Sequence, residues 1–287
     1  MAAGPEELER RGQSPLAYQP RRPVPWRFLD LLAVVAFFLA AQALLLFSLD
    51  AVFGWGILHN IVNPEAGLSN TEHAVIRLLP KGDLWVLLLC VLSAVVVTPI
   101  AEEFFFRVLL QGWLEAAFRR WRRKTSAWRR LVPIMAGPIL LSSLLFAGMH
   151  FRRSTASQFD TLSMVILIAV GEAGKLLAVL FAIPLLRWRV GATAVDFGWV
   201  PRRLGGDLVL GLATFAVVAV PIYAIQGLTP RLLPTDIAPD PVPLFFFALV
   251  LGFLYYRTHR ITPLVVVHAA LNATSLALTW LGTALGK

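Results

Sequence analysis

Apolar stretches long enough, or nearly long enough, to cross a lipid bilayer recur along the chain and alternate with short polar segments. A transmembrane helix needs about 20 predominantly apolar residues. Seven stretches meet or approach this length, at residues 28–49, 84–101 (continuing as an amphipathic helix to 118), 132–150, 162–186, 207–226, 244–256 and 263–285. The pattern predicts an all-α fold, a polytopic transmembrane helix bundle of about seven spans (six to eight).

Composition supports this prediction. Of the 287 residues, 57% are hydrophobic and 15% are charged, whereas soluble domains have about 45–50% apolar and about 25% charged residues. The single cysteine, Cys90, excludes an internal disulfide framework and a thiolate metal cluster. We expect one transmembrane bundle over residues 26–287, preceded by a polar, disordered tail at residues 1–25.

The basic residues are concentrated in four segments between the apolar stretches. These segments precede the first stretch, follow the second and the fourth, and precede the last. Because positive charge is retained on the cytoplasmic side of a membrane, we expect a cytoplasmic N-terminus, with Arg152 and Arg153 as a discordant pair outside. We therefore attribute the net charge of +9 to the topology of a protein in the cell membrane. The expected partner is the lipid bilayer and not nucleic acid.

Two adjacent carboxylates follow the second apolar stretch. On a helix, Glu103 and Arg107 lie on one face and can pair, whereas Glu102 points about 100° away. Glu102 would then have no local partner in a low-dielectric setting, which suits a general base. The alternative is a helix end at the cytoplasmic interface, where both acids are solvated and the arginine reaches toward water.

Two histidines lie in other apolar stretches. His150 ends the third stretch, where a single histidine also fits a hydrogen-bonded core residue. His268 and Asn272 lie four residues apart in the last stretch, so they share one helix face and also fit a structural pair between helices. Ionisable groups in apolar spans cost about 2.5 to 3.5 kcal/mol each on insertion scales, so such groups are functional candidates. Together, these residue types are what hydrolysis needs: a base, imidazoles that orient water or hold a metal, and an oxyanion donor.

The polar motifs also resemble, in their order along the chain, those of the CPBP intramembrane proteases. That family includes the type II CAAX prenyl endopeptidases and the bacterial Abi proteins. The matching motifs are Glu102-Glu103-x-x-x-Arg107, Phe146-x-x-x-His150 and His268-x-x-x-Asn272. The resemblance covers roughly residues 84–150 and 244–279, and the segment at about 160–230 is expected to be an additional pair of helices.

The resemblance implies a role for each motif residue. Glu102 would be the water-activating base, supported by Glu103 and Arg107; His150 would assist the water, and His268 and Asn272 would bind the oxyanion. Members of the family have been described both as zinc metalloproteases and as metal-free glutamate proteases. A zinc ion would be held by Glu102, His150 and His268, and the spacing of these residues leaves both mechanisms open, because the chain has no His-Glu-x-x-His helix.

We therefore predict an intramembrane endopeptidase that hydrolyses a peptide bond of a membrane-associated peptide or protein. The alternative is a non-proteolytic polytopic membrane protein, such as a transporter or a bacteriocin-immunity factor. Glu172 and Lys175 would suit a transporter, although their spacing favours a structural ion pair. The three remaining histidines are expected to be solvated in loops: His59, His73 and His259.

Overall fold

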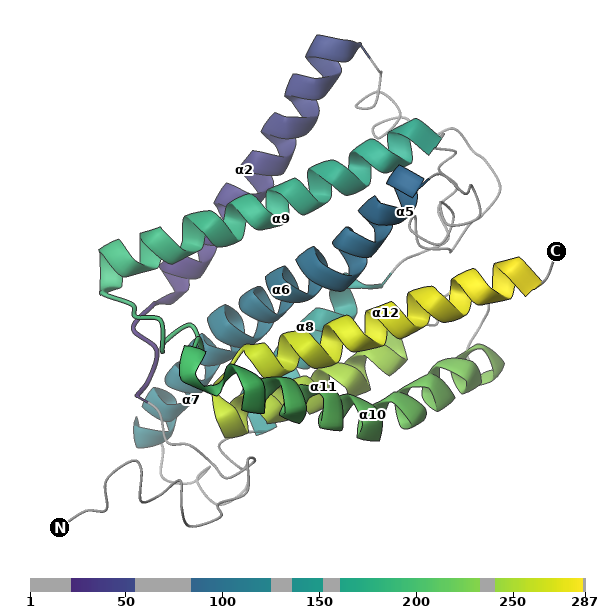
Figure 1. Cartoon of the computed structure of the whole chain (residues 1–287). Coiled ribbons are helices and arrows are strands. Elements are labelled where there is room, and N and C mark those ends of the chain that lie inside the picture. Colours follow the sequence, from purple (N-terminus) through teal and green to yellow (C-terminus); the bar gives the residue numbers. More distant parts are fainter. Residues whose placement is uncertain (1–21, 55–83, 125–135, 152–160, 233–240, 286–287) are drawn as a thin grey trace.

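The computed structural model describes residues 22–54, 84–124, 136–151, 161–232 and 241–285. All regular structure in these ranges is helical (Figure 1). Within them, six helices are long and apolar enough to span a membrane, and a seventh apolar helix is shorter. The predicted polytopic helical bundle is therefore confirmed. His59, His73, Arg152 and Arg153 lie outside the described residues.

One continuous helix of about 40 residues runs through the middle of the bundle. It is built from α5 (Leu84–Val91), the π-helical segment η2 (Leu92–Val97), α6 (Thr98–Glu103), a second π-helical segment η3 (Phe104–Gln111), and α7 (Gly112–Lys124). The predicted amphipathic continuation beyond residue 101 is confirmed. Because π-helical turns in proteins are rare and frequent at functional sites, the six residues of α6 between the two segments are the first place to look for a site.

The third apolar stretch forms a short helix in the part of it that the structure describes. The helix α8 covers Ala136–Met149, which is 14 residues and about 21 Å at 1.5 Å per residue. The hydrocarbon core is about 30 Å thick. Residues 132–135 of the predicted span lie outside the described residues, so the full length of this span stays a prediction.

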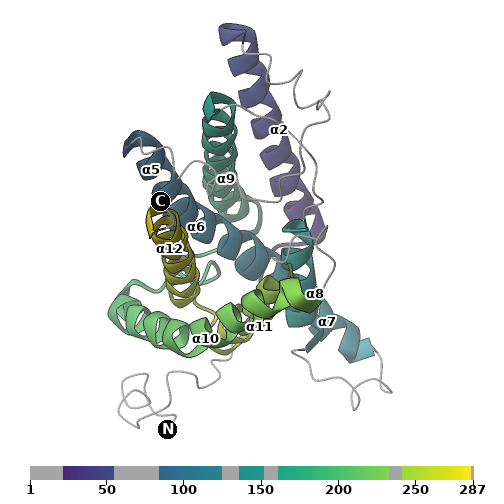
Figure 2. The same cartoon turned by 90° about the vertical axis from the view of Figure 1, so that its right-hand side faces the viewer.

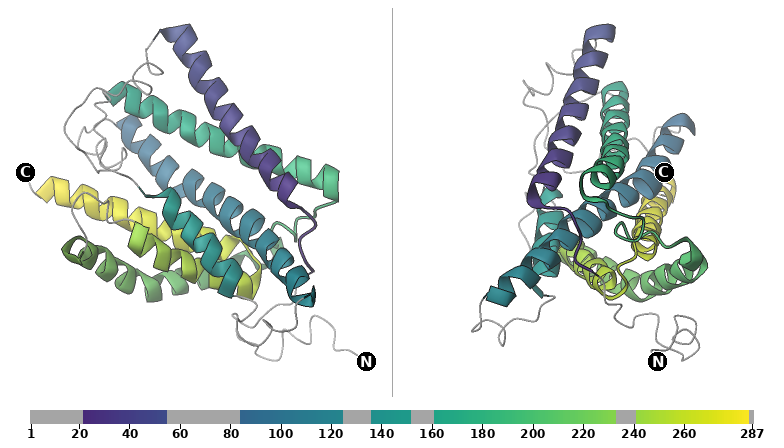
Figure 3. Two further views of the ribbon diagram at one scale, coloured as in Figure 1. Left: turned by 180° about the vertical axis from the view of Figure 1, so that it is seen from behind. Right: turned by 90° about the vertical axis from the view of Figure 1, so that its left-hand side faces the viewer.

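The other helices surround the long helix in two groups. On one side, α2 (Phe28–Phe53) packs against α9 (Thr161–Val190). On the other side, α10 (Leu204–Leu232), α11 (Pro241–Thr258) and α12 (Thr262–Leu285) pack together, with α10 contacting both neighbours. Figure 2 shows the two groups on opposite sides of α5 and α6. The short α8 packs against α11 and η3, as Figure 3 shows from behind.

The four basic segments meet at one end of the bundle. Arg189, at the end of α9, lies 3.1 Å from the Asp30 carboxylate at the start of α2. Arg260, in the turn between α11 and α12, pairs with Asp207 at the start of α10. A small cavity at this end is lined by residues from the chain before α2, from α7 and from the α11–α12 turn. The described parts of these segments thus lie at one end of the bundle, while their cytoplasmic orientation stays a prediction.

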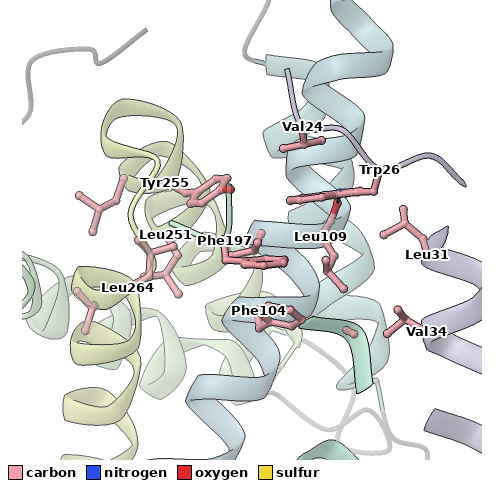
Figure 4. Packing of buried hydrophobic residues seen from close by; sticks show 14 of the residues in the cluster. Val24, Trp26, Leu31, Val34, Phe104, Leu109, Phe197, Leu251, Tyr255 and Leu264 are labelled. Atoms are coloured by element: carbon pink, nitrogen blue, oxygen red, sulfur yellow. Dashed lines mark hydrogen bonds between the residues drawn. The ribbon is translucent and has the colours of Figure 1, made fainter. Parts of the chain in front are cut away.

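The main core cluster secures this end of the bundle. Trp26 is 1% exposed, its indole N–H donates to the Leu109 carbonyl over 3.1 Å, and its ring stacks on Phe197 with centroids 5.9 Å apart. Phe197 also contacts Phe104 of the long helix (Figure 4). A buried tryptophan whose N–H is hydrogen-bonded contributes buried apolar area, and the hydrogen bond fixes the orientation of its ring. The segment before α2 is therefore tied to the long helix just beyond α6.

Candidate active site

The two adjacent glutamates lie at the end of α6, between the two π-helical segments. Glu103 is fully buried, whereas the Glu102 side chain retains 17% of its exposure. The Oε2 atom of Glu102 is buried without a hydrogen-bond partner among the described residues. The sequence-based expectation that Glu102 lacks a local partner therefore agrees with its surroundings.

Glu103 is held from two sides. Its Oε2 accepts from the Nε–H of Arg107 over 3.3 Å, one turn along the helix. Its Oε1 lies 2.8 Å from Nδ1 of His268, which comes from α12. Arg107 is itself fully buried. The predicted pairing of Glu103 with Arg107 is present, and the contact of Glu103 with His268 brings the first and third motifs together.

His150 reaches Glu102 because α8 runs antiparallel to the long helix and is short. Gly137, near the start of α8, faces the Phe118 ring so closely that a Cβ atom there would overlap it. Further along, the rings of Phe146 and Phe106 meet edge to face, with centroids 5.1 Å apart. His150 follows directly after α8, with its Nε2 atom 3.8 Å from Oε1 of Glu102.

Both imidazoles turn their Nε2 atoms toward Glu102. Nδ1 of His150 lies 2.8 Å from the Phe146 carbonyl, which can only accept, so this nitrogen carries the proton. Nδ1 of His268 contacts the Glu103 carboxylate in the same way. The Nε2 atom of His268 is 3.9 Å from Oε2 of Glu102. Each ring is thus fixed by one nitrogen and presents the other to the Glu102 carboxylate.

Asn272 lies one turn beyond His268 on α12 and contacts a different part of the long helix. Its side-chain amide donates to the Ala94 carbonyl over 2.8 Å. Ala94 belongs to η2, where the π-helical pattern changes the partners of the backbone carbonyls. The bond fixes α12 against η2 close to the glutamates. It uses one of the two amide hydrogens, and the other is left for a further partner.

The predicted zinc ligands, Glu102, His150 and His268, offer the right donor types. A histidine that ligates a metal usually donates its second ring N–H to a carboxylate or carbonyl, as both histidines do here. Within the described ranges, however, no three His, Cys, Asp or Glu side chains stand in an arrangement that could hold a metal ion. The zinc site therefore stays a prediction, and no chemical step below depends on it.

The structure adds four polar residues that the sequence motifs did not include. Ser142 of α8 accepts from Arg107 over 2.8 Å, and Gln111 donates to Glu115 over 3.1 Å. Glu115 in turn lies 3.3 Å from Nε2 of His259, which is only 7% exposed. The expectation of a solvated His259 is wrong, because the α11–α12 turn packs under the chain around Gly198. The sequence signal for Gln111 and Glu115 is the four-residue spacing that continues after Arg107.

A second intramembrane charge cluster lies one turn before Glu102. Lys175 Nζ is 2.8 Å from Glu172 Oε1 and 2.9 Å from the hydroxyl of Thr98. Thr98 donates to the Glu172 carboxylate in turn, at 3.2 Å from Oε1. The predicted ion pair of Glu172 and Lys175 is therefore present within α9. The hydrogen bonds of both side chains to Thr98 join α9 to α6.

Comparison with known proteins gives one match. The family model described as type II CAAX prenyl endopeptidase Rce1-like matches residues 84–274. The matched range begins at α5, includes all three polar motifs and extends over α9 and α10, so the segment at 160–230 lies inside it. The helix α2 lies outside it. No curated protein and no solved structure gives a match.

Proposed function

Because the chain belongs to the Rce1-like family of type II CAAX prenyl endopeptidases, we propose that it hydrolyses peptide bonds with water activated by Glu102. The substrate would be a membrane-associated peptide or protein, and the host membrane would be the cell membrane. The observation that supports this mechanism is the position of the Glu102 carboxylate between two imidazoles, with Nε2 atoms at 3.8 and 3.9 Å. These separations are too long for direct hydrogen bonds and suit a bridging water.

In the first step, the Glu102 carboxylate accepts a proton from the water, and the water oxygen attacks the carbonyl carbon of the peptide. His150 orients this water through its Nε2 atom, since its Nδ1–H is bound to Phe146. General-base assistance of this kind contributes about 10²- to 10⁴-fold to rate. Burial matters as well, because charges interact more strongly where bulk water is excluded.

In the second step, the tetrahedral oxyanion is stabilised and the peptide C–N bond breaks. His268, as an imidazolium whose Nδ1–H contacts Glu103, would donate its Nε2–H to the oxyanion, with the free amide hydrogen of Asn272 as a second donor. The proton held by Glu102 passes to the leaving nitrogen, so the products are an amine and a carboxylic acid, which then ionises by releasing its proton to solvent. Arg107 offsets the negative charge of Glu103 and keeps that carboxylate in place.

Cleavage of a fluorogenic peptide by purified protein in liposomes tests the proposal. We expect Glu102→Gln and His268→Ala each to lower kcat/KM by about 100-fold or more, because each removes a group that acts in the transition state. Both variants should retain the elution profile of the wild type. Wild-type protein without peptidase activity on any membrane-associated peptide would contradict the proposal.

Metal content decides between the two mechanisms described for the family. Zinc would be measured in wild-type protein and in His150→Ala protein, purified side by side. A zinc-dependent site predicts close to one zinc per chain and its loss in the variant, together with loss of activity in chelator. Full activity in chelator with no bound zinc would favour Glu102 acting on water alone.

A further inference from the structure

A buried row of polar side chains continues from the active site toward the basic end of the bundle. Its members repeat every fourth residue of the long helix, at Glu103, Arg107, Gln111 and Glu115. The last two are 0% and 6% exposed. Four-residue spacing keeps side chains near one helix face. Because buried polar groups are costly unless they are bonded, the partners of this row show what it holds in place.

Ser142 links Arg107 to Gln111, while Nη2 of Arg107 is buried without a hydrogen-bond partner among the described residues. Arg107 Nη1 donates to the Ser142 hydroxyl over 2.8 Å, and that hydroxyl donates to Gln111 Oε1 over 3.4 Å. The Gln111 amide donates to the Gly252 carbonyl over 2.9 Å and to Glu115. Arginine is only a donor and a backbone carbonyl only an acceptor. The carbonyl therefore fixes the orientation of the Gln111 amide, with Oε1 toward Ser142. The single Ser142 hydroxyl hydrogen has two acceptors at 3.4 Å, Gln111 Oε1 and the Ile139 carbonyl.

We propose that Ser142 and Gln111 are positioning residues for hydrolysis, which act by holding Arg107 in place. Arg107 orients Glu103, and Glu103 holds His268 through Nδ1. The consequence for the rate rests on the proposed function. The geometric consequence, the orientation of the His268 ring, does not.

Ser142 also connects the two histidines of the site. It lies on α8, the helix that ends beside His150, and it bonds to the long helix that carries Glu102. Glycine at position 252 allows this close packing, because a Cβ there would lie 3.1 Å from Gln111 Oε1 and 3.0 Å from the Ile139 side chain and would push both aside. One hydroxyl therefore links the helix of His150 to the side chains that hold His268.

The adjacent residue gives a matched control. Ser143 is also fully buried on α8, and its hydroxyl has no hydrogen-bond partner among the described residues. Ser142→Ala and Ser143→Ala remove the same atom at the same depth of one helix. We expect Ser142→Ala to lower kcat by about 10-fold with little change in KM, as for other residues that orient reacting groups. Ser143→Ala should stay within about twofold of wild type.

Two further variants separate the hydrogen bonds from the space that they occupy. Ser142→Thr keeps the hydroxyl and should restore most of the rate. Ser142→Cys keeps a similar volume with a weak hydrogen-bonding group, so it should behave like Ser142→Ala and replaces it if the alanine variant does not fold. Equal rates for Ser142→Cys, Ser143→Ala and wild type would overturn the inference.

Histidine NMR provides a readout that does not depend on catalysis. The chain has five histidines, so ¹⁵N-histidine labelling gives a simple spectrum, and His268→Ala assigns the His268 signals. The inference predicts shifted His268 ring nitrogens in Ser142→Ala and unchanged ones in Ser143→Ala. If wild type cleaves no peptide but these signals respond, the proposed function fails and the positioning link stands. If wild type is active and neither rate nor signals distinguish the two serines, the link fails and the proposed function stands.

Discussion

Two charged clusters lie one helical turn apart in this membrane protein, and they are bonded in different ways. In the cluster of Thr98, Glu172 and Lys175, the carboxylate, the ammonium and the hydroxyl bond to one another. In the neighbouring cluster, Glu102 keeps a buried oxygen without a hydrogen-bond partner among the described residues and faces two imidazole nitrogens at non-bonding distance. A closed ion pair fastens helices, whereas a carboxylate with open acceptor positions can bind and activate a reactant.

Removing the same charge from both clusters gives the largest expected contrast. Glu102→Gln should lower kcat/KM by about 100-fold or more, since an amide cannot accept the proton of water. Glu172→Gln makes the identical change one turn away and should lower kcat/KM by less than about threefold. The measurement is peptide cleavage in liposomes at matched protein concentration. Equal losses would mean that Glu172 also acts on the substrate, and the contrast between the clusters would disappear.

The cations of the two clusters should differ in their contribution to stability. Arg107→Met leaves the fully buried Glu103 without its counter-charge. Such a loss destabilises by about 3–5 kcal/mol when one partner of a buried pair is removed. Lys175 is 24% exposed, so Lys175→Met should cost only about 1 kcal/mol. Thermal unfolding midpoints in a mild detergent would measure both changes, and a larger drop for Lys175→Met would contradict this order.

The smallest effect is expected from removing the closed pair as a whole. The double variant Glu172→Gln, Lys175→Met leaves neither charge uncompensated, and replacing both members of a buried pair is often close to neutral. Its midpoint should therefore lie nearer to that of wild type than the midpoint of either single variant. Strict additivity of the two single changes would instead show that the Glu172 and Lys175 side chains are not coupled.

The helical bundle could be predicted from the chain because a bilayer leaves few solutions. Backbone groups in hydrocarbon must be satisfied internally, so apolar runs of sufficient length form helices. Hydropathy does not distinguish a full span from a shorter helix packed against protein, since both are apolar. For this reason the run at 132–150 was predicted to cross the membrane, whereas α8 covers only Ala136–Met149 in the described residues.

Pairing within one helix could also be predicted, and contacts between helices could not. Glu103 and Arg107 are one turn apart, so their bond follows from local geometry. The approach of His150 to Glu102 depends on the length and direction of α8, which no local spacing specifies. Gln111 and Glu115 continue the same four-residue series and were detectable in the sequence. Ser142 was not, because a serine in an apolar helix can equally bond to its own backbone.

The π-helical segment η2 allows the long helix to lose one residue without a change in the direction that the glutamates face. A π turn accommodates one residue more than an α turn, and each residue rotates an α-helix by about 100°. Deleting one residue within Leu92–Val97 could therefore be absorbed by conversion to an ordinary α turn, with Glu102 still facing His268. The carbonyl that Asn272 uses in this segment would then return to the ladder of the helix. A deletion of that kind should preserve the proton-accepting half of the site and release the half that receives the oxyanion.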